Sequence, residues 1–190
     1  MISGILAGWL LLNVTQAADT PDLDALLAGL AAADTSELAF REKRTSELLE
    51  QPLVVSGTLH HDGDGRLVRR TTEPSTETQI LSERHIEIRK PDGFRNRFSL
   101  RRAPELAVLR SALLGLLNGD RAALEKEFRL ALETTEEQPE QWQLRLEPRH
   151  SSEDMPVEHL LIHGCRNRIL RFVLQLSDGE TIDTEIEPVP

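Results

Sequence analysis

The segment PLVVSGTLHHDGDGRLVRRTTEP, residues 52–74, decides which fold this chain can adopt. Residues 53–61 alternate between the two faces of an extended strand, and residues 66–72 run back as a second strand. The sequence Asp62-Gly63-Asp64-Gly65 lies between them and is typical of a tight turn. Pro74 ends the second strand, because proline has no N–H to donate to a sheet ladder. The segment therefore predicts an antiparallel hairpin.

The same alternation recurs along most of the chain and places apolar side chains on one face of each strand. The predicted strands cover residues 37–46, 53–61, 66–72, 76–81, 84–90, 94–101, 128–134, 141–147, 157–165, 169–177 and 180–186. We expect their apolar rows to face inward; these rows include Phe94, Phe98, Leu100, Trp142, Leu144, Leu146, Leu170, Phe172 and Leu174. The arginines of residues 66–72 are expected outside, or at the mouth of whatever the sheet encloses.

Two other segments, one amphipathic and one short, have the sequence features of helices rather than strands. Residues 19–33 begin with Thr20 as a candidate cap and Pro21 at the first helical position, and their leucines fall on one face. Residues 121–127 follow Asp120, which is expected to cap a short helix.

A third helix is predicted in the middle of the chain, at residues 104–117. It starts at Pro104, ends at Asn118-Gly119, and carries Arg110 as its one charge between residues 106 and 117. A helix that is apolar nearly all round is buried on more than one side. We expect it to act as a movable plug; the alternative is a permanently packed core helix.

Ten or eleven antiparallel strands with one apolar face each predict a sheet wide enough to curl. We therefore expect a mostly β fold with additional helices, of the α+β class. The strongly curved antiparallel sheet would form an incomplete barrel, with the helices covering its concave apolar face. That face is either filled by the central helix or available to an apolar ligand.

The N-terminal segment predicts export. An apolar run at residues 5–14 precedes Thr15-Gln16-Ala17, a pattern typical of a cleaved signal peptide of residues 1–17, which leaves one domain at 18–190. No lysine or arginine precedes the run, so a retained hydrophobic helix is the alternative. The single cysteine, Cys165, lies far from the cleavage site, so we expect a core thiol, no lipid anchor and a soluble periplasmic protein.

The charge distribution argues against nucleic-acid binding. The formal net charge is −10; residues 41–102 hold 13 basic and 10 acidic residues, whereas residues 103–190 hold 9 and 17. Aromatic residues make up 4% of the chain, too few for base stacking. Arg95, Arg97 and Arg101 form a row that is either a solvated outer face or a strip that attracts lipid phosphates.

The histidines do not predict a metal site. His60 and His61 point to opposite faces of a strand, and His159 and His163 share a face but lie about 13 Å apart. The chain has no Gly-x-Ser-x-Gly sequence, phosphate loop or dinucleotide motif. We therefore expect no catalytic residue, no metal, no cofactor and no enzymatic activity.

The order of these elements resembles the LolA/LolB-like family of periplasmic outer-membrane lipoprotein carriers. A leader and an amphipathic helix precede Phe40 in the first strand, and Gly57-Thr58-Leu59 follows, with Pro74 seventeen residues after the glycine. WQLRLEP (142–148) and the hairpin LQLSDGETIDTEI (174–186) are also similar to the family. The resemblance covers nearly all of the mature chain and rests on the order and spacing of short motifs.

The resemblance implies an incomplete eleven-strand barrel with a helical lid and a hydrophobic cavity for acyl chains. It further implies a lipoprotein or exported lipid as cargo, an inner-membrane exporter as donor, an outer-membrane receptor as acceptor, and a monomer. The candidate cavity residues are Phe40, Phe94, Phe98, Leu100, Leu109, Leu113, Leu117, Trp142, Leu144, Leu146, Leu170, Phe172 and Leu174.

The chain also departs from the family pattern. Gly63 and Asp64 stand where the carriers have an Arg-Pro pair tied to ligand handling and lid closure. We therefore expect either a carrier of general lipoproteins or, at least equally, a divergent carrier dedicated to one exported lipid or lipoprotein. The competing interpretations are a regulatory protein that senses lipids or lipoproteins on the same fold, and an enzyme.

Overall fold

The computed structural model describes residues 22–33, 37–62, 65–135, 137–150 and 156–188. Within them the chain forms eleven strands, three α-helices and one 3₁₀ turn. The elements are α1 (Leu23–Ala31), β1 (Glu37–Thr45), β2 (Leu53–Asp62), β3 (Arg66–Glu73), β4 (Glu77–Leu81), β5 (His85–Arg89), β6 (Arg95–Ser99), the 3₁₀ turn (Leu100–Arg102), α2 (Pro104–Leu117), α3 (Arg121–Glu127), β7 (Phe128–Thr135), β8 (Gln138–Pro148), β9 (Val157–Cys165), β10 (Arg168–Leu176) and β11 (Thr181–Pro188).

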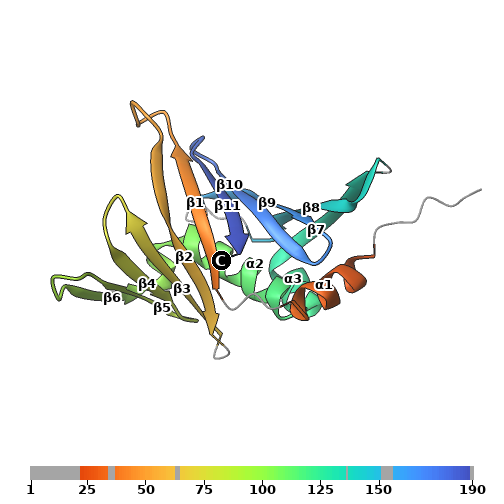
Figure 1. Cartoon of the computed structure of the whole chain (residues 1–190), viewed down its shortest axis with the longest axis horizontal. Coiled ribbons are helices and arrows are strands. Elements are labelled where there is room, and N and C mark those ends of the chain that lie inside the picture. Colours follow the sequence, from red (N-terminus) through yellow and green to blue (C-terminus); the bar gives the residue numbers. More distant parts are fainter. Residues whose placement is uncertain (1–21, 34–36, 63–64, 136, 151–155, 189–190) are drawn as a thin grey trace, which may run out of the picture.

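All the strands join one antiparallel sheet in the order β6-β5-β4-β3-β2-β1-β11-β10-β9-β8-β7. Two meanders, β1–β6 and β7–β11, meet where β1 pairs with β11, from Leu38 opposite Pro188 to Thr45 opposite Thr181. In the described residues, β6 and β7 are the two edges and do not pair with each other. The sheet is therefore curved but not closed, which confirms the incomplete barrel (Figure 1).

The helices lie on the concave side of the sheet (Figure 1). Helix α2 contacts β9 on the sheet and both other helices, α1 and α3. Its buried residues accordingly surround the helix rather than forming one stripe: Val108, Leu109, Ala112, Leu113, Leu114, Gly115 and Leu116. This packing explains the apolar sequence of α2, and its mobility stays a prediction.

Helix α1 begins at Leu23, two residues after the first helical position that the sequence indicates. Its N-cap is Asp22, whose Oδ1 accepts hydrogen bonds from the backbone N–H groups of Asp24 (2.9 Å) and Ala25 (3.2 Å). The expected cap at Thr20 is therefore wrong: a carboxylate at Asp22 supplies the same acceptor and adds a favourable charge at the positive end of the helix. Thr20 and Pro21 lie outside the described residues.

The other predicted helix boundaries are confirmed. Pro104 is the first residue of α2, and Asn118 is its C-cap. Asp120 caps α3, with its Oδ1 accepting from the N–H of Ala123 at 2.9 Å. By contrast, the strand expected at 94–101 is shorter, because Ser99 starts the 3₁₀ turn and its Oγ accepts from the N–H of Arg101 at 3.3 Å.

Gly57 occupies a position in β2 that leaves no room for a side chain. The pairing of β2 with β3 shifts register between Ser56 and Gly57, which brings β3 close to the glycine. A Cβ added at Gly57 would lie 1.9 Å from the carbonyl oxygen of Arg70. The shift and the glycine therefore depend on each other.

Candidate ligand-binding site

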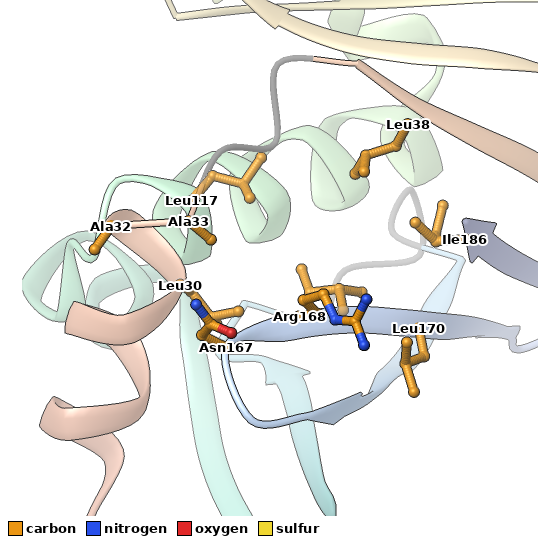
Figure 2. Close-up of a pocket in the computed structure, with 10 residues that line it drawn as sticks. Leu30, Ala32, Ala33, Leu38, Leu117, Asn167, Arg168, Leu170 and Ile186 are labelled. Atoms are coloured by element: carbon orange, nitrogen blue, oxygen red, sulfur yellow. The ribbon is translucent and has the colours of Figure 1, made fainter. Parts of the chain in front are cut away.

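An apolar pocket of about 330 Å³ lies at the corner where α1, α2, β1, β10 and β11 meet. The side chains around it come from segments far apart in the sequence (Figure 2). The lining residues are Leu30, Ala32, Ala33, Leu38, Leu117, Asn167, Arg168, Ile169, Leu170 and Ile186.

The pocket exists because both helices end at this corner. Leu30 is buried in the last turn of α1, and Leu117 is the last residue of α2. Leu38 and Ile186 lie on the paired strands β1 and β11 beneath them, Ile186 opposite Phe40. Among the described residues, the pocket is therefore formed where the two helices end over the concave face.

The β9–β10 turn that borders the pocket is fastened to β8. Arg166 in this turn has a positive φ of 54°, which is uncommon for a residue with a side chain. The Nε1 of Trp142 donates to the carbonyl of Arg166 (2.8 Å), and the guanidinium of Arg166 pairs with Glu140 (2.7 Å). Trp142 also covers Gly164, where an added Cβ would lie 2.0 Å from the indole ring. These contacts hold Asn167 at the pocket.

The chemistry of the lining is that of an apolar binding site. Aliphatic side chains dominate, and polar side chains enter only from Asn167 and Arg168 among the residues that line it. The volume is at the small end of the range for pockets that hold organic ligands. Arg168 is the one ionisable side chain among these lining residues.

Most of the predicted cavity residues are in the packed core. Leu117 and Leu170 do line the pocket. Phe98 is half-buried and packs against the core. The remaining buried members are Phe40, Leu100, Leu109, Leu113, Trp142, Leu144, Leu146, Phe172 and Leu174.

The expectation that Phe94 faces inward is wrong, and Leu170, although it lines the pocket, is not buried in the core. Phe94 precedes β6 and is 49% exposed, with the ammonium of Lys90 5.6 Å from its ring centre. Leu170 is 40% exposed, because β10 shifts register between Ile169 and Arg171 where it pairs with β9. A bulge of this kind removes one residue from the alternation and leaves it without a partner.

Sequence reasoning missed the pocket residues contributed by α1, β1 and β11. Leu30 is one of the leucines of residues 19–33 that the sequence places on one helix face, but nothing in the sequence gives it a role at a cavity. Leu38 and Ile186 carried no signal of their own, because a leucine or isoleucine on an apolar strand face is ordinary. Only the pairing of β1 with β11 brings these two residues together.

The arginines of β3 are divided between the two faces of the sheet. Arg66 and Arg70 are exposed, as expected. Arg69 is only 8% exposed and its guanidinium reaches Glu42, which is 2% exposed, so the expectation that it stays outside or at a mouth is wrong. Its position follows the alternation of β3, since Leu67 and Thr71 on the same face are also buried.

The other residues singled out from the sequence lie on the surface or are half-buried. Arg95, Arg97 and Arg101 are exposed, but Arg101 lies in the 3₁₀ turn beyond the strand. Cys165 is half-buried rather than in the core. Within the described ranges, no group of three or more His, Cys, Asp or Glu side chains is arranged to hold a metal ion. None of the helices in these ranges is long and apolar enough to cross a membrane.

The sequence model of the family described as outer membrane lipoprotein carrier protein LolA-like matches residues 15–183. No protein of curated function matches the chain in sequence.

Solved structures with a similar arrangement include a LolA superfamily protein from Nitrosomonas europaea, at 12% identity and a TM-score of 0.44, which covers 88% of this chain and 92% of that chain. A putative outer membrane lipoprotein-sorting protein domain from Vibrio parahaemolyticus has 8% identity and a TM-score of 0.45, covering 86% and 89%. A DUF1329 family protein from Desulfovibrio piger has 10% identity and a TM-score of 0.46, covering 87% and 90%.

Proposed function

Because this chain belongs to the LolA-like family of outer membrane lipoprotein carrier proteins, we propose that it carries acyl chains through the periplasm. Its cargo is a lipoprotein or an exported lipid, which it receives at the inner membrane and delivers to the outer membrane. The donor is an inner-membrane exporter and the acceptor an outer-membrane receptor. The protein binds and releases its cargo without chemical change.

The observation that carries this proposal is the apolar pocket at the corner of the half-barrel. Its aliphatic lining matches a hydrocarbon chain, because burying each CH₂ group contributes about 0.8 kcal/mol. Its place beside the ends of α1 and α2 allows cargo to enter without breaking a strand pair. The divergence from the family at Gly63 and Asp64 supports a dedicated cargo over a general one.

A substitution that fills the pocket tests this function. Ala33 lines the pocket, and Ala33→Phe would occupy space that the acyl chain needs. Displacing two methylene groups lowers affinity roughly tenfold, since each contributes about 0.8 kcal/mol. Binding of a fluorescent fatty acid, followed by its emission, should be saturable with the native protein and at least that much weaker with Ala33→Phe.

Ala122→Phe is the matched control, because Ala122 is exposed on α3 and does not line the pocket. It should bind the fatty acid like the native protein, and circular dichroism should show that both variants are folded. Equal affinity for all three proteins would place the acyl chain outside this pocket. Failure of the native protein to bind would contradict the carrier function itself.

A further inference from the structure

A buried group of charged side chains interrupts the apolar concave face on β1 and β3. Glu42 is 2% exposed, and its Oε1 lies 3.0 Å from both the Nη2 of Arg69 and the Nε of Arg44. Thr184 on β11 donates its hydroxyl to the other oxygen of Glu42 at 3.5 Å. The guanidinium of Arg69 stacks over the ring of Phe40 at 4.6 Å.

The two buried charges of this group, Arg69 and Glu42, form an ion pair, whereas the side chain of Arg44 is 30% exposed. Two guanidinium groups share the single buried carboxylate of Glu42. Two partly exposed carboxylates lie nearby: Glu77, 3.7 Å from Lys90, and Glu180, 3.9 Å from Arg44. Desolvation by burial, which outweighs the attraction of Glu42, lowers the pKa of Arg69. A further anion close to Arg69 would therefore be stabilised.

A pocket of about 260 Å³ opens in front of these residues. Its outer wall is partly apolar: Leu53 is 43% exposed, and Val55 and Pro74 line the pocket beside it. Its inner wall contains Arg69 and Gln79, which face each other across the β3–β4 pair. The pocket is thus polar at the bottom and apolar towards its opening.

Two buried polar atoms of the inner wall lack a hydrogen-bond partner within the described part of the chain. One is the Nη2 of Arg69, which has only its 3.0 Å ion pair with Glu42, and the other is the Oε1 of Gln79. The orientation of the Gln79 amide is fixed, since its Nε2 donates to Glu77 at 2.8 Å. Unsatisfied buried groups of this kind are rare and call for a partner.

We propose that this pocket on the concave face of β1, β2, β3 and β4 binds the anionic headgroup, a carboxylate or a phosphate, of an amphiphile. The anion accepts from Arg69, and a protonated oxygen of the headgroup or a bound water donates to Gln79. The first methylene groups of the amphiphile contact Leu53, Val55 and Pro74. The inference rests on the proposed function in taking the ligand to be an amphiphile, and it names the class of headgroup.

The headgroup pocket is separate from the apolar pocket, although both lie on the concave face along β1. Leu38 lines the apolar pocket, and Glu42 lines the headgroup pocket. Four residues of strand separate them, about 13 Å. Phe40 is buried between them.

Isothermal titration calorimetry tests the inference, with dodecanoate and dodecyl phosphate below their critical micelle concentrations and dodecanol below its solubility limit. The native protein should bind at least one of the two anions roughly tenfold more tightly than dodecanol, as one charge-assisted hydrogen bond predicts. Tighter binding of dodecanoate assigns a carboxylate, and tighter binding of dodecyl phosphate assigns a phosphate. Equal affinities for all three probes would overturn the inference.

Substitutions at Arg69 and Glu42 test whether the preference for an anionic headgroup arises in this pocket. Arg69→Met should abolish the preference for the anion, whereas Arg70→Met, the same change at the exposed neighbour on the other face of β3, should keep it. Glu42→Gln is isosteric and removes the competing carboxylate, so it should strengthen anion binding even if Arg69→Met does not fold. An anion preference that survives Arg69→Met, or that Glu42→Gln weakens in a folded protein, would overturn the inference.

The same titrations separate this inference from the proposed function. If no probe binds the native protein, both the carrier function and the headgroup site are contradicted. If dodecanol binds as tightly as the anions, only the headgroup site is contradicted.

Discussion

Two histidines on the convex face of the sheet have pKa values that the fold lowers. His159 and His163 are half-buried on β9, among Arg145, Arg171 and Asp183 of neighbouring strands. Burial, reinforced by Arg145 for His159 and by Arg171 for His163, lowers the pKa of each imidazole. The folded protein therefore binds protons at these sites less readily than the unfolded chain does.

This difference predicts that acidification destabilises the protein. Above about pH 6.5, the ordinary histidine pKa, both histidines are neutral in both states and cost nothing. As the pH falls from there towards the lower pKa of the folded state, the unfolded chain takes up protons first, so the free energy of unfolding decreases. Urea midpoints measured at pH 7.5 and 5.5 should show this loss.

The double variant His159→Gln/His163→Gln should lose less stability over that interval than the native protein. His85→Gln on β5 is the control for removing a strand histidine. A native midpoint that does not change between the two pH values, or a double variant that loses as much as the native protein, would contradict the assignment.

At the scale of the element, β8 shows how alternation sorts side chains between core and solvent. Leu144 is fully buried in the core, while its neighbour Arg145 points to the convex face and forms a 2.8 Å ion pair with Glu147. Trp142 and Leu146 are buried on the same side as Leu144. The strand therefore has one structural face and one tolerant face.

Substituting Asp at adjacent positions of β8 should separate these faces. Leu144→Asp places an unpaired carboxylate in the core and should cost at least about 4 kcal/mol, a large part of the stability of a domain of this size. Arg145→Asp loses a partly exposed ion pair and should cost about 1 kcal/mol or less. Urea unfolding measures both, and equal losses would mean that the register of β8 is wrong.

Other elements depart from simple alternation where the pairing changes. The bulge in β10 exposes Leu170, and the register shift in β2 requires Gly57. Helix α2 departs from amphipathicity for a different reason, since it contacts both the sheet and the other helices. In each case the departure is caused by a contact with another element rather than by the local conformational preference of the residue.

At the scale of the whole molecule, the half-barrel offers two pockets of opposite character on one concave face. The apolar pocket lies where the helices end, and the headgroup pocket lies around Glu42 and Arg69. A carrier with this arrangement can hold an apolar chain and discriminate a polar head. We propose that it does so as one exported domain of residues 18–190.

Export is tested by the intact mass of the protein recovered from the periplasmic fraction. The apolar run at residues 5–14 followed by Thr15-Gln16-Ala17 predicts cleavage, so the mature chain should begin at Ala18 or Asp19. A full-length chain recovered from the cytosol would contradict the periplasmic assignment.

The sequence by itself determined the strands, most of their turns, the caps of α2 and α3, and the curved open sheet. These features are local: the period of two, a glycine or proline at a turn, and an Asp before a helix act within a few residues. Even the family follows from the order of such signals, as the match over residues 15–183 confirms.

Only the tertiary structure decided where the pockets lie. The apolar pocket depends on the pairing of β1 with β11, on the ends of two helices and on a bulge, and no window of sequence contains all of these. In the sequence, Arg69 is one of several arginines expected in solvent. Only the folded structure places Glu42, from another strand, beside it. Cavities and buried charge pairs arise from how distant segments fit together, so their physical cause is packing between elements rather than propensity within them.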